Sequence, residues 1–310
     1  MNLSGVLIVD KPTGLTSHDV ILKLRRMLGT RRVGHAGTLD PGASGLLLAC
    51  VGPATKIVQF LSLYDKEYEA VIKLGVTTDT YDGEGKVVAT HQGVLPDPDQ
   101  IERVFLSFEG RMLQTPPPYS AVKHRGKKLY QYARARQKVE VSPREVEIKE
   151  MQVLRMDLPY VEFRVRCSKG TYVRSLAFDV GRKLGCGAHL AKLRRTGAGP
   201  FRLSDALRVE ELEAIQHRGD ISTVMVPIER TLSHLPWVRV KKECADKVKH
   251  GVAIDRACIE SLEGDFGAGD SISVRDRNGQ VLAVGRALSS SGQLRDERHE
   301  GKLFEYSRVI

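Results

Sequence analysis

Asp40 is the side chain of this sequence whose type and setting most suggest chemistry. It lies in the stretch Arg31–Gly45, which holds five Gly or Pro residues, and no charged residue occurs from Pro41 to Thr55. The glycines and prolines predict turns and close backbone approaches rather than a helix or strand. An Asp before Pro is also a common turn former, so the residue types alone favour a structural role for Asp40.

The chain carries an excess of positive charge that is unevenly distributed. Its formal net charge is +10 over 310 residues. Seven Lys or Arg and no acid occur in Lys123–Lys138, nine occur in Arg164–Arg195 with Asp179 as the only acid, and Pro236–Ile310 is nearly neutral. Either cluster alone is typical of a solvated face. Together with the Gly-rich carboxylate loop, they favour a track for the phosphate backbone of a nucleic acid.

Motifs for common cofactors are missing from the sequence. Gly29 and Gly34 have the spacing of a phosphate-binding loop, but His35-Ala36 follows where Lys-Ser/Thr is required. G-x-G-x-x-G, H-E-x-x-H and G-x-S-x-G do not occur, and the nine histidines are dispersed. We therefore expect an enzyme that works without a metal, nucleotide or redox cofactor.

Cysteine usage and hydropathy predict a cytoplasmic protein. The five cysteines are scattered and form no C-x-x-C pair, which fits reduced thiols in a cytosol. Charged residues appear by Asp10 and Lys11, so we expect no signal peptide. The least charged window, Pro41–Thr55, is too short and too Gly-rich to span a bilayer.

The segment Gly34–Pro41, with the sequence GHAGTLDP, resembles the catalytic loop of the bacterial tRNA pseudouridine-55 synthases, the TruB family. The resemblance implies that Asp40 is the nucleophile. Tyr68, in Lys-Glu-Tyr, matches the tyrosine that stacks on the target uracil and acts as general base. Arg174, in Ser-Lys-Gly-Thr-Tyr-Val-Arg, matches the arginine that pairs with the aspartate. Without the match, Tyr68 is typical of a core aromatic, and Arg174 of a phosphate contact or a helix-face charge.

Further residues match the substrate-binding positions of the family. The resemblance implies that Tyr172 and Leu193 line the uridine pocket and that His35 holds the loop once the target base is flipped out. A histidine satisfied within a turn is the alternative for His35. Lys11 and Lys56 lie in matching segments and position the fold or a phosphate.

Lys123–Val146 matches an inserted basic segment of the family, the thumb, which closes on the T-arm of tRNA. Lys127 and Lys128 are its expected phosphate contacts. A target base must leave its stack to reach a pocket, which is cheapest in a loop such as the T-loop.

The implied reaction suits a single carboxylate. An Asp can attack a sugar carbon that develops oxocarbenium character, as in retaining glycosidases, which also need a second carboxylate for the leaving group. Pseudouridine formation rejoins the same uracil to the same sugar through carbon. A carboxylate, a base for the C5 proton and a dry pocket are sufficient for it. The sequence leaves open whether Asp40 attacks C1′ of the sugar or C6 of the ring.

Strands and helices without regular βαβ alternation predict an α+β, mixed-sheet catalytic domain over residues 1–232, with the thumb inserted. Residues 233–310 are expected to form a small β-barrel similar to a PUA domain, an RNA-binding module. The expected strands are Gly5–Val9, Tyr68–Leu74, Val161–Cys167, Gly269–Val274 and Val281–Gly285, and Leu46–Val51 is expected to be a buried apolar segment. The expected helices are Val20–Leu28, Pro53–Phe60 and Val173–Leu184, and turns or loops are expected at Asp10–Gly14, Thr77–Lys86, Thr115–Tyr119, Lys192–Arg195 and Asn278-Gly279.

Two other functions remain open at this point. The first is an RNA-binding or RNA-folding protein in which Asp40 is only structural. The second is a guide-RNA-dependent pseudouridine synthase with partner proteins, against which the basic thumb argues. The favoured hypothesis is a monomeric enzyme that acts on tRNA, without membrane or metal.

Overall fold

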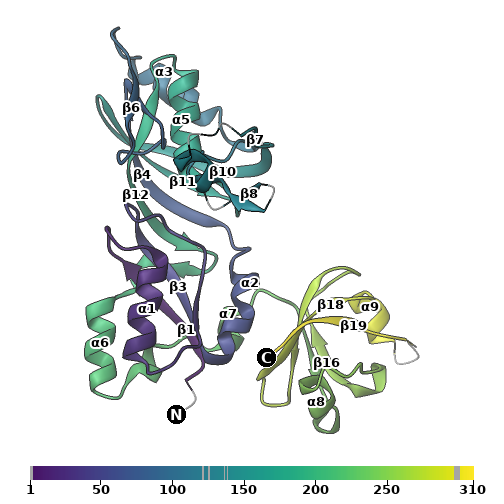
Figure 1. Ribbon diagram of the computed structural model, residues 1–310. Helices are drawn as coiled ribbons and strands as arrows, with labels where there is room; N and C mark the ends of the chain where they lie inside the picture. The colour runs from purple at the N-terminus through teal and green to yellow at the C-terminus, as the bar shows by residue number, and fades with distance from the viewer. Residues whose placement is uncertain (1–2, 121, 125, 136, 138, 297–300) are drawn as a thin grey trace.

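A ten-stranded mixed sheet is the framework of the larger of two units in the computed structural model (Figure 1), which describes residues 3–120, 122–124, 126–135, 137, 139–296 and 301–310. The strand order is β14-β1-β3-β12-β4-β11-β10-β7, with β2 on β3 and β13 on β12. The strands are β1 (Gly5–Lys11), β2 (Val33–Ala36), β3 (Ser44–Val51), β4 (Lys66–Leu74), β7 (Gly110–Gln114), β10 (Arg144–Asp157), β11 (Tyr160–Cys167), β12 (Ala188–Ala198), β13 (Phe201–Arg202) and β14 (Leu207–Arg208).

The burial of these strands follows their sequence patterns. Strands β1 and β3 are almost wholly buried and appear in the sequence as continuous apolar runs. Strand β4 alternates strictly between buried and half-buried residues, as predicted from its period of two. The antiparallel pairs of β4 with β11 and β12 place Tyr68 in the middle of the sheet.

Helices pack on this sheet at separate places (Figure 1). Helices α1 (Ser17–Met27) and α6 (Val209–His217) cover β1 and β3. Helices α3 (Pro98–Leu106) and α5 (Val173–Lys183) share a core with β4, β10 and β11. The capping box predicted at Thr16 and Asp19 is confirmed, and Gly29 after the helix has a φ of +62°.

The short elements of this unit complete the fold. The predicted helix at Pro53–Phe60 is a 3-10 turn, η1 (Gly52–Ile57), followed by α2 (Val58–Leu61). The remaining short elements are β5 (Val76–Thr78), β6 (Val87–Thr90), η2 (Leu203–Asp205), η3 (Ile221–Val224) and α7 (Ile228–Thr231).

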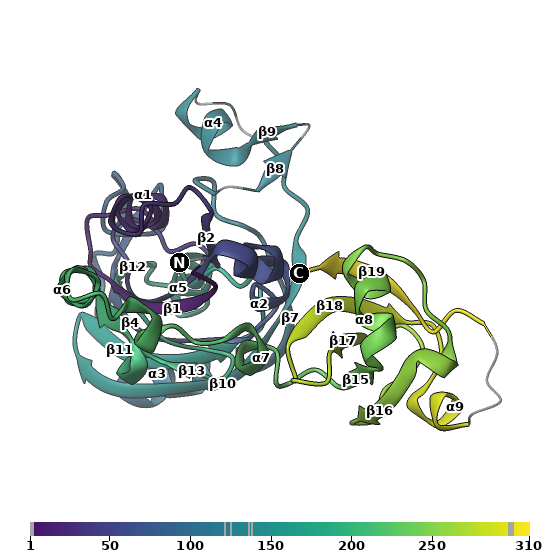
Figure 2. The same ribbon diagram turned by 90° about the horizontal axis from the view of Figure 1, so that it is seen from below.

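Residues 115–143, called the arm here, leave the sheet between β7 and β10. They depart after Gln114 and return at Arg144, and these two residues pair with each other. The arm contains β8 (Lys123–His124), β9 (Lys127–Lys128) and α4 (Leu129–Arg134), which stand away from the body of the protein in Figure 2. Its first residues, Thr115–Tyr119, form neither helix nor strand, as expected from their prolines. Residues 144–146 of the predicted thumb lie in β10.

The smaller unit is a five-stranded sheet with the order β16-β15-β17-β18-β19. The predicted hairpin at Asn278-Gly279 is confirmed, with a φ of +83° at Gly279. Val281 and Val284 pack in one apolar cluster with Ile228 and Leu232 of the larger unit. The elements are β15 (Trp237–Val240), α8 (Lys242–Lys249), η4 (Arg256–Cys258), β16 (Ile259–Glu263), β17 (Ser271–Arg275), β18 (Val281–Ala287), α9 (Ser291–Arg295) and β19 (Phe304–Val309).

Four local predictions are wrong, and all assigned strand residues to turns or loops. Asp10 and Lys11 extend β1, Val33–Ala36 form β2, Thr77 and Thr78 belong to β5, and Lys192–Arg195 belong to β12. The glycines of this region serve close strand packing rather than turns. At Gly45, φ is +102° and an added Cβ would collide with the backbone of Arg195 on the neighbouring strand. Within the described ranges, no helix has the length and apolar character needed to cross a membrane.

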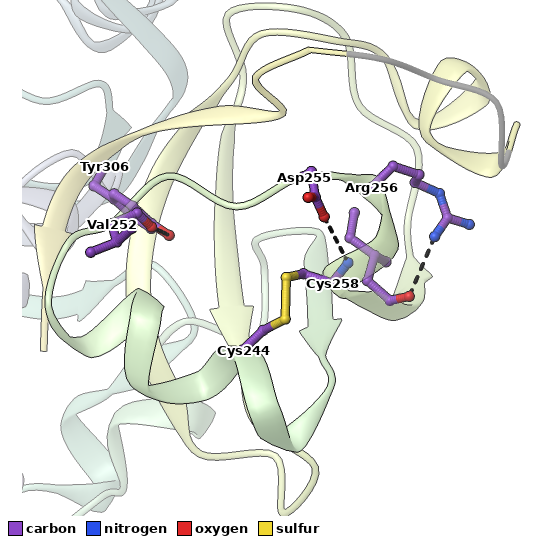
Figure 3. The surroundings of a disulfide bond; sticks show 7 residues. Cys244, Val252, Asp255, Arg256, Cys258 and Tyr306 are labelled. Atoms are coloured by element: carbon purple, nitrogen blue, oxygen red, sulfur yellow. Dashed lines mark hydrogen bonds between the residues drawn. A yellow bond between two sulfur atoms is a disulfide. The ribbon is translucent and has the colours of Figure 1, made fainter.

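The expectation of five reduced cysteines is wrong for two of them. Cys244 of α8 and Cys258 of η4 form a disulfide with Cα atoms 5.8 Å apart (Figure 3). The amide of Cys258 donates a hydrogen bond of 3.2 Å to Asp255 Oδ1, which caps η4. Cys50, Cys167 and Cys186 are free and buried.

The disulfide predicts a thiol count. Protein purified and unfolded without reductant should react with a thiol reagent at three cysteines, and Cys244→Ser protein at four. Because the bond closes a loop across a separation of 14 residues, its loss should lower the free energy of unfolding of the smaller unit by about 3 kcal/mol. Five reactive thiols in unreduced wild-type protein would contradict the pairing.

Candidate active site

Asp40 and Arg174 form an ion pair, although 133 positions of sequence separate them in the chain. Asp40 Oδ2 lies 2.9 Å from Arg174 Nε. The Arg174 side chain is 8% exposed and that of Asp40 is 46% exposed. The Nε hydrogen has no hydrogen-bond acceptor in line with it, so the contact is a charge pairing rather than a linear hydrogen bond. The predicted aspartate–arginine pair is therefore present in the fold.

Arg174 contacts two further segments of the chain. Its Nη1 lies 3.3 Å from Asp82 Oδ2 and donates a hydrogen bond of 3.2 Å to the Thr80 carbonyl. Its Nη2 donates a 2.9 Å bond to the Tyr119 carbonyl in the arm. A buried guanidinium needs such partners because its desolvation is otherwise uncompensated.

Asp82 was not among the predicted site residues. The turn-rich sequence around it predicts a loop, and the signal in the sequence is the group of acids in that segment, Asp79, Asp82 and Glu84. In the fold this loop adjoins β12, and Asp82 forms an isolated bridge with Leu190. That pairing brings a second carboxylate to Arg174.

A cavity of about 430 Å³ opens beside the ion pair. Its size falls in the range of about 300–1,000 Å³ found for small-molecule sites. A second cavity, of about 250 Å³, adjoins it, and Asp40, Arg174 and Leu193 line both. The residues that line the larger cavity include Asp40, Lys66, Tyr68, Tyr172, Leu193 and Arg195.

Two predicted aromatic residues line the larger cavity. Tyr68 on β4 is buried, and this burial raises the pKa of its phenol, while the Arg195 guanidinium lowers it. Tyr172 precedes α5, and burial raises the pKa of its phenol. The Gln114 amide group holds the backbone of Tyr172 with bonds of 2.8 and 3.2 Å.

Lys66 and Arg195 line the cavity but were not among the predicted site residues. Lys66 donates to the Ser62 and Tyr64 carbonyls, and burial lowers its pKa to about 8. Arg195 is 1% exposed and donates to the Leu46 carbonyl at 2.6 Å and the Gly37 carbonyl at 3.0 Å. Both side chains lie against Gly37, three residues before Asp40.

Lys11 lies beneath the loop and not in the cavity. It is 0% exposed, and its ammonium donates to the Pro12, Leu15 and Pro41 carbonyls at 2.9, 2.6 and 3.4 Å. Burial lowers its pKa. Of the two roles expected for Lys11, positioning the fold is the one that this geometry supports.

The other expected substrate-binding residues lie outside the cavity wall. His35 on β2 is half-buried, its Nδ1 has no hydrogen-bond partner, and burial lowers its pKa. Lys56 is half-buried in η1. Lys127 is exposed on β9 of the arm, whereas the side chain of Lys128 lies outside the described part of the structure. Among the described residues, no three His, Cys, Asp or Glu side chains are grouped so that they could hold a metal ion.

Family models match nearly the whole chain. Residues 25–173 match the TruB family pseudouridylate synthase N-terminal domain, residues 174–233 the tRNA pseudouridylate synthase B C-terminal domain, and residues 236–309 the PUA domain. The chain belongs to the TruB family. The predicted fold class, a mixed-sheet catalytic domain followed by a PUA domain, is thereby confirmed.

Relatives cover most of the sequence. The chain is 45% identical to tRNA pseudouridine synthase B of Geobacillus thermodenitrificans, over 84% of this chain and 89% of that protein. It is 43% identical to tRNA pseudouridine synthase B of Burkholderia mallei, over 96% of each.

Solved structures are similar as well. A chain of an H/ACA ribonucleoprotein bound to a substrate RNA containing 2′-deoxyuridine is 28% identical, with a TM-score of 0.78 over 98% of this chain and 84% of that one. A chain of an archaeal box H/ACA complex is 29% identical, with a TM-score of 0.79 over 98% and 85%.

The position of Asp82 predicts its effect on activity. In Asp82→Asn, Arg174 loses one of its two carboxylate partners, so its placement against Asp40 should loosen. A displacement of about 1 Å can cost roughly 100-fold in rate, and we expect kcat for pseudouridine formation to fall by about that factor with little change in KM.

Asp79→Asn is the matched control in the same loop. Its carboxylate accepts a bond from the Lys86 amide, which an Asn oxygen can also accept. Equal losses in the two variants would mean that the loop, and not the Arg174 contact, is responsible.

Proposed function

We propose that this TruB-family protein converts the T-loop uridine at position 55 of tRNA to pseudouridine, with Asp40 as its nucleophile. The protein is a tRNA pseudouridine synthase of the same kind as its curated relatives. The observation that carries the assignment of Asp40 is its half-exposed carboxylate, ion-paired with a buried Arg174 at the edge of a base-sized cavity.

The roles of the cavity residues follow from their chemistry. The target uridine leaves its stack and enters the cavity, where Tyr68 offers an aromatic face and Leu193 an apolar wall. Asp40 forms a transient bond to C1′ of the sugar or to C6 of the ring, and this bond breaks again before the product leaves. In the net reaction the N1–C1′ bond breaks and a C5–C1′ bond forms. The C5 proton leaves to Tyr68 as general base, and N1 gains a proton. Atoms and electrons balance without water, metal or redox cofactor.

Arg174 balances the negative charge of Asp40 as the entering base excludes water. Tyr172, which precedes Arg174 by two residues, lines the cavity beside it. His35, Lys11 and Lys56 act from outside the cavity, on the loop and its surroundings. Lys11 in particular holds the loop through the Pro41 carbonyl.

The substrate partner is the T-arm stem-loop of tRNA. The projecting arm, with Lys127 exposed on it, supplies cations for the phosphate backbone, and the PUA domain adds a second RNA contact. The enzyme acts as a monomer in the cytoplasm, where tRNA is processed.

Dependence on a guide RNA is the competing function, since similar chains occur in H/ACA complexes. The basic arm favours the unaided enzyme because it gives the protein its own means of docking RNA. Purified protein and an unmodified tRNA transcript, followed by mapping of the modified nucleoside, distinguish the two. Conversion that requires an added guide RNA would contradict the proposal.

Asp40→Asn tests the nucleophile. The change keeps the size of the side chain but removes its charge and its nucleophilic oxygen. Turnover should fall by several orders of magnitude, as for catalytic carboxylates generally. Affinity for tRNA should stay within a few-fold, because phosphate contacts dominate it. Pseudouridine formed per enzyme and the tRNA Kd are measured on the same protein.

Asp97→Asn is a control for that change, since Asp97 caps α3 and Asn caps helices equally well. It should be indistinguishable from wild type. Near-normal turnover of Asp40→Asn would reduce Asp40 to a turn residue, and joint loss of binding and turnover would indicate misfolding.

Lys127→Ala tests the arm. If the ammonium meets a phosphate, tRNA affinity should fall and the slope of log affinity against log salt should become shallower by about 1. Lys183→Ala is the control, since Lys183 lies at the end of α5, outside the arm. Its ammonium donates a hydrogen bond of 2.6 Å to the Ser107 hydroxyl and lies over the Phe108 ring. An unchanged salt slope would mean that Lys127 is exposed to solvent and does not contact a phosphate of the RNA.

A further inference from the structure

Arg195 is the largest fully buried polar side chain of the described structure, and the reaction as proposed assigns it no role. It neighbours Arg194, which is half-exposed and pairs with Asp10 at 2.7 Å. The alternation of β12 thus turns one arginine toward Asp10 and the other into the catalytic cavity. A buried cation of this kind costs desolvation energy that its contacts must offset.

The contacts of Arg195 converge on the catalytic loop. Its Nε donates to the Leu46 carbonyl at 2.6 Å and its Nη2 to the Gly37 carbonyl at 3.0 Å. These carbonyls lie on opposite sides of Asp40 in the sequence. The backbone of Arg195 also pairs with Gly45, at the end of the same loop. One residue therefore holds both flanks of the loop.

Arg195 also faces Tyr68. The two residues are direct partners in the register of β12 and β4, and both line the larger cavity. The Arg195 guanidinium acts on the Tyr68 phenol and lowers its pKa. Because a guanidinium has donors and no acceptor, any hydrogen bond between the two side chains must be accepted by the phenol oxygen.

We propose that Arg195 is a positioning residue for this reaction, whose guanidinium lies beside Tyr68 in the cavity and donates to the Gly37 and Leu46 carbonyls, and so fixes the Tyr68 phenol relative to the Asp40 loop. The inference rests on the proposed function, because it presupposes that Tyr68 removes the C5 proton. The guanidinium fork is suited to this task, since it holds several acceptors in fixed geometry, whereas a lysine ammonium cannot.

The charge of Arg195 has a consequence for pH. A cation beside a phenol favours its ionised form and lowers its pKa. Burial, Cys167 and Asp40 act on the Tyr68 pKa in the opposite direction. Other ionisable groups that line the cavity are Lys66, Tyr119, Tyr130, Tyr172 and Arg174.

The sign of the effect of removing Arg195 is therefore defined. Without the cation, the pKa of Tyr68 rises, and a rate that depends on proton uptake by Tyr68 needs a higher pH. A nearby opposite charge typically shifts a pKa by about 1–3 units, so the rising limb of the pH–rate profile should move upward by about one unit or more.

The experiment compares Arg195→Gln and Arg195→Lys with wild type in single-turnover reactions on a T-arm stem-loop, from neutral to alkaline pH. Both variants should lose about 100-fold in rate at neutral pH, as expected for a misplaced catalytic group, with stem-loop Kd within a few-fold. The rising limb of the pH–rate profile should move to higher pH only in Arg195→Gln, since Arg195→Lys keeps the positive charge beside Tyr68.

Arg164→Gln is the matched control. Arg164 lies on β11 of the same sheet and pairs with the half-buried Glu69, the neighbour of Tyr68 that points to the opposite face. Its profile should coincide with that of wild type. A folded Arg195→Gln with the wild-type limb, or with a rate within twofold of wild type, would overturn the proposal.

A second measurement covers the case in which Arg195→Gln does not fold. Arg195→Lys is then compared in the wild-type and Tyr68→Phe backgrounds. If Arg195 acts through the Tyr68 hydroxyl, the substitution should cost little in Tyr68→Phe. The same loss in both backgrounds would overturn the proposal. Wild-type protein that leaves the stem-loop unmodified would instead refute the proposed function.

Discussion

The burial of one guanidinium, that of Arg174, is the constraint on which the site depends. Its charge is matched by Asp40 and Asp82 and by the carbonyls of Thr80 and Tyr119, which come from three loops far apart in the chain. Removing one partner of a buried ion pair typically costs about 3–5 kcal/mol, and the half-exposed Asp40 contributes less than a fully buried partner would. The same contacts that stabilise the charge also assemble the site.

Backbone carbonyls play the corresponding role for the other buried cations. Lys11, Lys66 and Arg195 each donate to two or more of them, and none of these three has a carboxylate as its principal partner. Positive charge therefore exceeds negative charge around the cavity. Such a site favours a polyanionic substrate, whose phosphates supply the missing negative charge. The cavity and the basic arm thus both carry an excess of positive charge.

Much of this could be predicted from local patterns. The capping box at Thr16, the alternation of β4 and the Asn278-Gly279 hairpin depend on near neighbours in sequence, and the GHAGTLDP run identified Asp40. The features that escaped prediction depend on register between distant strands. Nothing local distinguishes Arg194 from Arg195, because the pairing of β12 with β3 and β4 decides which one is buried. Asp82 and the disulfide of Cys244 with Cys258 are likewise set by how separate segments meet.

The root of the arm has a mechanical consequence. The arm leaves and re-enters the sheet at one pair of residues, Gln114 and Arg144. Gln114 forms hydrogen bonds with the backbone of Tyr172, and the Thr115 carbonyl accepts a 2.8 Å hydrogen bond from the Ser175 hydroxyl. Gln114 and Thr115 therefore hold the start of α5 on either side of Arg174. A pull on the arm is therefore transmitted to the residue that holds Asp40. The arm and the Asp40–Arg174 pair therefore share one set of hydrogen bonds at the start of α5, so a change in the position of the arm root also changes the surroundings of Arg174.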